Sequence, residues 1–239
     1  MADRRDFGWP AGLVCLGLLG AGWFVGHGFE AGRSTPPSVT VKGLAERFVT
    51  ADLAVWPLRF TATGNDLEAV QAEIDDDVLA VTAFLAEAGL PEAAIQPQRV
   101  EVTDLLAQPY RPEGVGDNRF IIAQTVLVRT DQVETIDSLG RQSGELVRRG
   151  VVLVETGGPT YLFTRLNEIK PEMLAAATRN AREAAEQFAE DADAGIGGIR
   201  SASQGLFQIL PRDEVPMLPE TAQLEKKIRV VSTITYELE

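Results

Sequence analysis

The chain nearly lacks the two side chains that most often carry chemistry: its 239 residues include one cysteine, Cys15, and one histidine, His27. Both lie in an apolar run near the N-terminus, where we expect neither to react. Elsewhere the sequence lacks the usual cysteine and histidine ligands of zinc, iron and copper, a thiol nucleophile and a histidine base. A disulfide within one chain is also excluded. We therefore expect no cofactor, no metal site and no catalytic residue, and we lean against an enzyme.

Basic residues are scarce as well: 22 lysines and arginines face 35 aspartates and glutamates, for a net charge of −13. Residues 1–33 contribute three of each sign, so the rest of the chain carries the whole net charge. Nucleic acid and anionic lipid are attracted by basic surfaces, and this surface is acidic. We expect no nucleic-acid partner and interpret the acidity mainly as a source of solubility.

Charge of either sign is absent from residues 9–29. A helix of that length rises about 1.5 Å per residue and so spans about 30 Å, the thickness of the hydrocarbon layer of a bilayer. Two arginines precede the run, and the positive-inside rule places the N-terminus in the cytoplasm. We predict a signal-anchor in the inner membrane: residues 1–8 are cytoplasmic, residues 9–29 cross the bilayer, residues 30–38 form a tether and residues 39–239 form a periplasmic domain.

The apolar run leaves two questions open. A candidate signal-peptide cleavage site lies at Gly26-His27-Gly28. Cleavage there would leave a soluble periplasmic protein instead of an anchored one. Gly22 and Gly26 stand four residues apart, the spacing that lets membrane helices approach closely, so they are candidates for transmembrane helix pairing. Glycine is also common in membrane helices that do not pair through it.

The remaining sequence alternates between strand-like and helical segments. Strand-like sequence occupies residues 39–42, 48–63, 99–106, 120–130, 151–155, 161–165, 199–210 and 226–238. Helices are predicted to start at Asn65 and Asp131, each followed three residues later by glutamate as in a capping box, and a third has Pro171 in its first turn. After the first strand the order reads helix, strand, strand three times. This order predicts an α+β fold, with antiparallel sheets and helices packed on one face.

Periodicity also predicts which side chains face the core. On the three helices we expect these inward-facing residues: Leu67, Val70, Ile74, Val78, Val81 and Leu85; Val133, Ile136, Leu139 and Leu146; Leu174, Ala177, Ala181, Ala184 and Phe188. Trp56 and Phe60 fit core positions of a strand. The apolar phase of that strand segment changes across Pro57, which predicts a bulge or an exposed edge there.

The densest acidic run is Asp75-Asp76-Asp77, which could in principle attract a hard cation. Successive helical residues point about 100° apart, and Ile74 and Val78 claim the buried face. We therefore place the acidic run on the solvated surface. A hydrolase that works through paired carboxylates stays open, because the fold and not a motif assembles such a pair.

The segment VTVKGLAERFVTADLAVW, residues 39–56, resembles the N-terminal signature of the SIMPL-domain family, which reads roughly V-x-G-x-G-x(6)-P-D-x-A. Val41, Gly43, Asp52 and Ala54 match it, whereas alanines stand at the second glycine and at the proline. The alanine-rich segment NAREAAEQFAEDADAGIGGIRSASQG and the strand IRVVSTITYEL resemble the family's third-helix segment and its closing strand, in the same order. The resemblance covers nearly all of the chain beyond the tether.

The resemblance implies the bacterial branch of the family, whose members are periplasmic or envelope proteins. Some assemble into large ring or channel-like homo-oligomers, some are linked to oxidative-stress tolerance, and no catalytic residue can be carried over. We expect a non-catalytic protein, held in the lipid bilayer through residues 9–29, that forms a homo-oligomer and supports envelope integrity or oxidative-stress tolerance. One alternative is a binding module for a small envelope ligand of unknown identity or a partner protein, with Tyr110 in the loop QPYRPEGVGDN as a contact. A carboxylate-based hydrolase is the less favoured alternative.

Overall fold

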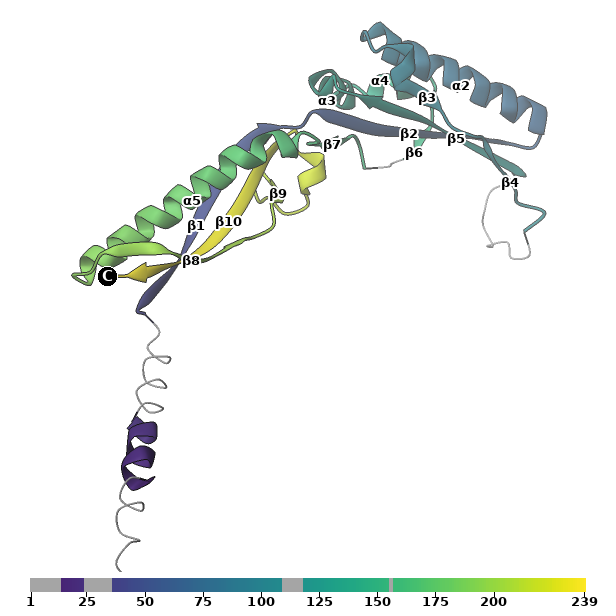
Figure 1. Cartoon of the computed structure of the whole chain (residues 1–239). Helices are drawn as coiled ribbons and strands as arrows, with labels where there is room; N and C mark the ends of the chain where they lie inside the picture. Colours follow the sequence, from purple (N-terminus) through teal and green to yellow (C-terminus); the bar gives the residue numbers. More distant parts are fainter. Residues whose placement is uncertain (1–13, 24–35, 109–117, 155–156) are drawn as a thin grey trace, which may run out of the picture.

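The structure is a computed structural model that describes residues 14–23, 36–108, 118–154 and 157–239. Residues 14–23 are helical, and the rest folds into two antiparallel sheets with helices packed on them (Figure 1), so the predicted α+β class is confirmed. Most of the predicted membrane segment, 9–29, and of the tether, 30–38, lies outside the described residues. Within the described ranges, no helix is both long and apolar enough to cross a bilayer.

The first sheet, sheet A, is built around β10 (Glu225–Leu238). On one side β10 pairs along its length with β1 (Ser38–Thr50), and on the other with β8 (Ile196–Gln204) and β9 (Gln208–Pro211). Alternate residues of β10 are buried, which confirms the period-two prediction for the closing strand. The single strand predicted for residues 199–210 is instead two strands, because the register against β10 shifts by one residue between Gln204 and Gln208, so residues 205–207 leave the ladder.

Helix α5 (Leu166–Asp191) lies along one face of sheet A (Figure 1). Its buried stripe consists of residues spaced four apart: Met173, Ala177, Ala181, Ala185 and Ala189. Such small side chains allow a close approach, and a Cβ added to Gly43 of β1 would lie 1.8 Å from the Ala177 carbonyl oxygen. Gly43 is therefore required by packing and not by a turn.

Two predictions about this helix are wrong. Phe188 is 60% exposed, because the stripe of small residues spaced four apart continues through Ala185 and Ala189 and turns Phe188 away from the sheet. Pro171 lies inside the helix and not in its first turn. The helix begins earlier, at Leu166, because Asp52 binds the amides just ahead of it.

The second sheet, sheet B, has the strand order β3–β5–β2–β6, with β4 also paired to β5 and β7 to β2. The strands are β2 (Leu53–Gly64), β3 (Ile95–Pro97), β4 (Glu101–Asp104), β5 (Phe120–Thr130), β6 (Leu153–Val154) and β7 (Thr160–Leu162). One face is covered by α2 (Leu67–Glu87), α3 (Val133–Arg141) and α4 (Gly144–Arg148) (Figure 1). Two short 3-10 turns, Glu92–Ala94 and Glu220–Ala222, complete the described elements.

The core of sheet B contains Trp56 and Phe60, as predicted. The phase change expected at Pro57 does not occur, because alternate residues from Ala54 to Ala62 are buried without interruption. The break falls earlier, at residues 51–52, where the chain leaves sheet A and enters sheet B. Pro57 is in register with Leu127 of β5 and stands between the residues of β2 that pair with β7, 53–55, and those that pair with β6, 59–60.

The helix starts differ from the predicted caps. Asp66, not Asn65, caps α2 by accepting from the amides of Glu68 (3.0 Å) and Ala69 (3.1 Å). The second predicted helix is divided into α3 and α4. The capping box predicted between Asp131 and Glu134 is not formed, and no side chain caps the start of α3. All four residues predicted to face inward from this segment are nevertheless buried: Val133, Ile136, Leu139 and Leu146.

Two side chains of α2 lie opposite to the prediction. Leu67 is 44% exposed, because it stands at the first turn beside the edge of the sheet. Asp77 is 8% exposed and is therefore not on the solvated surface where the acidic run was placed. It follows Ile74 by three residues and precedes Val81 by four, so it shares their buried face.

Candidate functional site

The site residues predicted from sequence fall near the N-terminus and in one loop. Gly22 belongs to the described helical segment, and a Cβ added to it would meet no atom within 4 Å. Gly26 and Tyr110 lie outside the described residues. Pairing through the two glycines and contact through Tyr110 stay predictions. In the described part of the chain, no group of three or more histidine, cysteine, aspartate or glutamate side chains is arranged to hold a metal ion.

The face of sheet A opposite α5 is the first candidate surface. Val41, Gly43 and Ala45 of β1 point toward α5, so the alternate residues point to the other side. We call this side the open face: Thr40, Lys42, Leu44, Glu46 and Phe48, with their partners Thr235, Thr233, Val231, Arg229 and Lys227 on β10. Within the described residues, α5 is the one α-helix in extensive contact with this sheet, and it lies on the other side.

The open face combines apolar and polar side chains. Phe48 is 64% exposed and Leu44 is 40% exposed. A hollow of about 360 Å³ lies beside Phe48, next to the ion pair between Arg212 and Glu225. At the other end of the face the hydroxyls of Thr40 and Thr235 hydrogen-bond to each other (2.9 Å). Exposed apolar side chains on a sheet face are typical of a packing surface.

The two outer edges of sheet A differ. On the β1 edge, the side-chain amide of Asn180 reaches from α5 and donates to the Leu44 carbonyl (2.7 Å), which occupies an acceptor that an added strand would need. On the other edge, seven of the nine residues of β8 are exposed, and within the described residues β8 pairs with β10 alone. The β8 edge is therefore the more accessible of the two.

A polar junction joins the two sheets at Asp52. Its carboxylate accepts from the amides of Thr164 (2.8 Å) and Arg165 (3.1 Å) and from Arg165 Nε (3.0 Å). Burial alone would raise the pKa of Asp52, but the hydrogen bonds from Thr164 and Arg165 outweigh it and hold the pKa below its ordinary value. Asp52 thus fixes the start of α5 beside the strand that enters sheet B.

The same junction bears on the hydrolase alternative. Three acidic residues, Asp52, Asp131 and Glu134, are among those that line a hollow of about 520 Å³. A general acid needs a raised pKa, however, and the pKa of Asp52 is lowered while three donors occupy its oxygens. Asp77 does have a raised pKa, but it lines neither this hollow nor the one beside Phe48. This geometry favours a structural role for Asp52.

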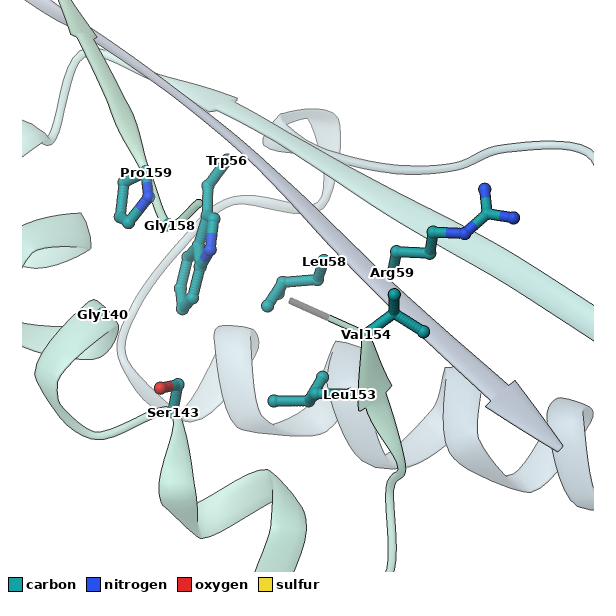
Figure 2. A pocket seen from close by; sticks show the side chains of 9 residues that line it. All are labelled: Trp56, Leu58, Arg59, Gly140, Ser143, Leu153, Val154, Gly158 and Pro159. Carbon is teal, nitrogen blue, oxygen red and sulfur yellow. The ribbon is translucent and has the colours of Figure 1, made fainter. Parts of the chain in front are cut away.

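A small cavity opens beside Trp56 (Figure 2). It has a volume of about 170 Å³ and is lined by apolar side chains that include Trp56, Leu58 and Leu153, with the Ser143 hydroxyl on one side. Figure 2 shows the Arg59 side chain pointing away from the indole, and its guanidinium binds Glu101 (2.7 Å). The cavity has room for a small apolar group and offers no paired acid and base.

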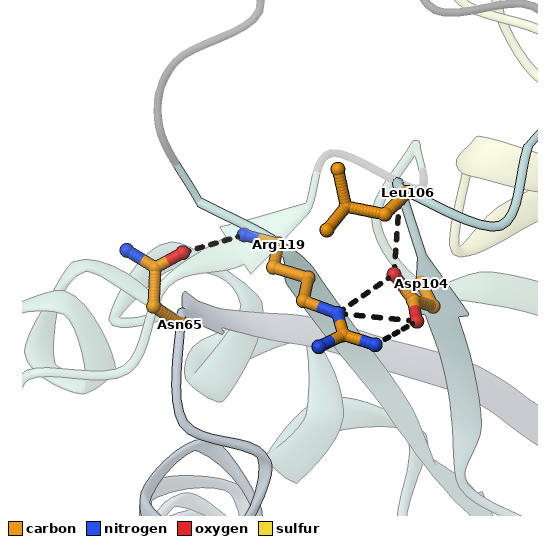
Figure 3. A network of polar contacts seen from close by, with 4 residues as sticks. All are labelled: Asn65, Asp104, Leu106 and Arg119. Atoms are coloured by element: carbon orange, nitrogen blue, oxygen red, sulfur yellow. Dashed lines mark hydrogen bonds and ion pairs between the residues drawn. The ribbon is translucent and has the colours of Figure 1, made fainter.

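The loop that contains Tyr110 is clamped where it leaves sheet B (Figure 3). Asp104, at the end of β4, accepts from Arg119 Nη2 (2.8 Å) and Nε, and from the amide of Leu106 (2.9 Å). The amide of Arg119 in turn donates to Asn65 Oδ1 (2.9 Å). The motifs in the sequence did not predict this clamp, although an acidic and a basic residue at the two ends of a proline-containing loop were a usable signal.

Comparison with models of protein families gives a match over most of the chain. The family described as "SIMPL: Protein of unknown function (DUF541)" matches residues 39–236 of the chain. No curated protein matches it. Four positions that carried the sequence resemblance now have structural explanations: Val41 and Ala54 are buried, Gly43 lies beneath α5, and Asp52 binds the two amides just ahead of α5.

Proposed function

The chain belongs to the SIMPL family, and from this premise we propose that it is a non-catalytic, membrane-anchored periplasmic protein that assembles with copies of itself and supports envelope integrity or oxidative-stress tolerance. The observation that carries the proposal is the open face of sheet A. Phe48 and Leu44 are exposed there, on a side of the sheet that α5 leaves uncovered.

A second copy of the chain suits this face because the face is mixed in character. Threonine hydroxyls and Lys42 lie at one end of the face, Leu44 near its middle and Phe48 at the other end. β-Sheets with such faces pack about 10 Å apart with interdigitating side chains. Two-fold packing of identical faces is self-complementary, and it closes as a dimer. The accessible β8 edge then offers a separate surface through which dimers associate further.

The location follows from the apolar run. Residues 9–29 carry no charge, and two arginines precede them, which supports an inner-membrane anchor with the folded domain in the periplasm. Alkaline phosphatase fused after Glu239 should be active, and a green fluorescent protein at the same place should stay dark. The reverse pattern would place the domain in the cytoplasm and defeat this part of the proposal.

Mass photometry of the detergent-extracted full chain tests the assembly. The wild type should form dimers or larger particles at micromolar concentration, and Phe48→Glu should shift them toward the monomer because it places a charge in the packed face. Phe188→Glu is the matched control: Phe188 is 60% exposed, close to the 64% of Phe48, but it lies on α5 and not on the open face. A monomeric wild type, or an equal effect of the two variants, would contradict the proposal.

The runner-up is a binding module that uses the clamped loop, and the bidentate Asp104–Arg119 pair favours it, because a fixed base positions a loop for contact. Replacing residues 109–117 by a Gly-Ser stretch of equal length separates the two functions. Assembly should survive this change if it depends on the open face, and only the capture of a partner should be lost.

A further inference from the structure

Strand β4 has an outer edge that pairs with no described strand, and this edge lies beside helix α2. Among the described strands, β4 pairs with β5 alone. The amide of Leu105 continues that ladder by donating to the Arg119 carbonyl (2.8 Å), and bonding alternates along an antiparallel strand. Glu101 and Thr103 therefore direct their backbone groups to β5. The N–H and C=O of Val102 point outward, away from the sheet.

An apolar groove lies next to that edge. Val102 is in register with Ile122, whose side chain is buried beneath α2, so the Val102 side chain lies on the α2 side of the sheet. A shallow groove of about 570 Å³ runs between β4 and α2, and its lining consists of Leu67, Glu68, Gln71, Ala72, Asp75 and Val102. Its apolar walls are accessible, because Leu67 is 44% exposed and Val102 is 53% exposed. A free strand edge beside a helix groove is the arrangement that accepts an added peptide strand.

The rim of the groove is acidic. Glu68 and Asp75 are exposed and stand seven positions apart on α2, or about 10 Å along its axis. Asp75 accepts from Gln71 Nε2 (2.9 Å), and neither carboxylate forms an ion pair with a described residue. On an extended strand, two residues four positions apart point to the same side and are separated by about 13 Å. Long, flexible basic side chains at these two positions can bridge the difference from the spacing of the two carboxylates, about 10 Å.

We propose that the β4 edge and the α2 groove form a docking site for an extended peptide segment of a partner protein, with the pattern basic–x–apolar–x–basic. The central residue pairs its backbone with Val102, and its apolar side chain lies between Leu67 and Val102. The two basic side chains reach Glu68 and Asp75. This surface is on sheet B, so the proposal is independent of assembly through sheet A.

The probe is the peptide acetyl-Lys-Thr-Val-Thr-Lys-amide with a fluorescent label, titrated with the full chain in detergent micelles and followed by fluorescence anisotropy. It should bind saturably. The same peptide with glutamate in place of both lysines, and a copy with an N-methylated central valine, should each bind at least about tenfold more weakly, because the first loses charge complementarity and the second loses a strand hydrogen bond. Equal binding of all three peptides, or no binding of the first at millimolar concentration, would overturn the proposal.

Variants of the chain locate the site. The double variant Glu68→Gln/Asp75→Asn should weaken the lysine peptide about fivefold. Its matched control is Glu73→Gln/Asp76→Asn, which makes the same charge change at exposed positions of α2 outside the groove lining and should leave binding unchanged. Val102→Pro removes the outward N–H and should abolish strand pairing, with circular dichroism as the check on folding. Equal losses in the two double variants would show non-specific attraction and refute the site.

Discussion

Replacing Asp77 by asparagine should stabilise the protein at neutral pH. Asp77 is 8% exposed, on the face of α2 that packs against sheet B. Burial, followed by the charges of Glu73 and Asp76, raises the pKa of Asp77 from 3.8 to about 6. The ionised side chain is therefore a cost to the folded state, and asparagine has nearly the same shape without the charge.

The magnitude follows from the size of the pKa shift. A rise of about two pH units corresponds to about 3 kcal/mol at most, since one unit is about 1.4 kcal/mol. The sign follows from proton binding: between pH 3.8 and about 6 the folded state holds a proton that the unfolded state has released. Stability from this group therefore falls as the pH rises through that window, and the full cost is present above about pH 6.

Urea unfolding of the wild type and of Asp77→Asn at pH 4 and pH 7.5 measures this cost. The variant should gain about 1–3 kcal/mol in the free energy of unfolding at pH 7.5 and little at pH 4. Asp75→Asn is the control, because Asp75 is an exposed carboxylate on the same helix and should give no gain at either pH. An equal gain at both pH values would show that charge burial is not the cause, and no gain at pH 7.5 would refute the reasoning.

Three further changes test the packing. Gly43→Ala should lower the free energy of unfolding in urea by at least about 3 kcal/mol, because the new Cβ would meet the backbone of α5. Gly144→Ala is the control: no atom lies within 4 Å of its new Cβ, so the free energy of unfolding should stay the same or rise by up to about 1 kcal/mol. Asp52→Ala should lower the free energy of unfolding by about 2–4 kcal/mol at pH 7 and by less at pH 3. The reason is that the pKa of Asp52 is lowered in the folded protein, so its carboxylate stabilises the fold above pH 3.8 and loses this contribution when acid protonates it. Glu220→Gln should cost about 2–4 kcal/mol, because Lys226 is fully buried and pairs with Glu220 (2.6 Å); an unchanged unfolding midpoint would contradict this.

The sequence predicts best those elements whose side-chain pattern reports one buried face. The predicted strand 120–130 has the bounds of β5, and the alternation of residues 226–238 appears in β10. Asp77 was placed at the surface because it is charged, and that prediction is wrong. Its helical spacing from Ile74 and Val81 places it on the buried face instead. The prediction also fails at Phe188, since a stripe of alanines, and not the largest apolar residue, faces the sheet.

The candidate surfaces depend on contacts between distant parts of the chain, which periodicity does not report. The open face exists because β1 pairs with β10 and α5 takes the other side, so the exposure of Phe48 follows from the position of that helix. The docking groove requires α2 to lie beside β4. Gly43 and Asp52 were identified by resemblance alone, and the structure supplies the reasons for them: close packing against α5 and hydrogen bonds to the backbone just ahead of α5.

Site-directed cross-linking gives the most direct test of assembly through the open face. With Cys15 replaced by serine, Phe48→Cys becomes the single thiol of the chain, and a short bismaleimide should join two copies into a covalent dimer in the membrane. The account predicts this dimer for Phe48→Cys and none for Phe188→Cys, which is similarly exposed on α5. Equal cross-linking at both positions, or none at position 48, would contradict it.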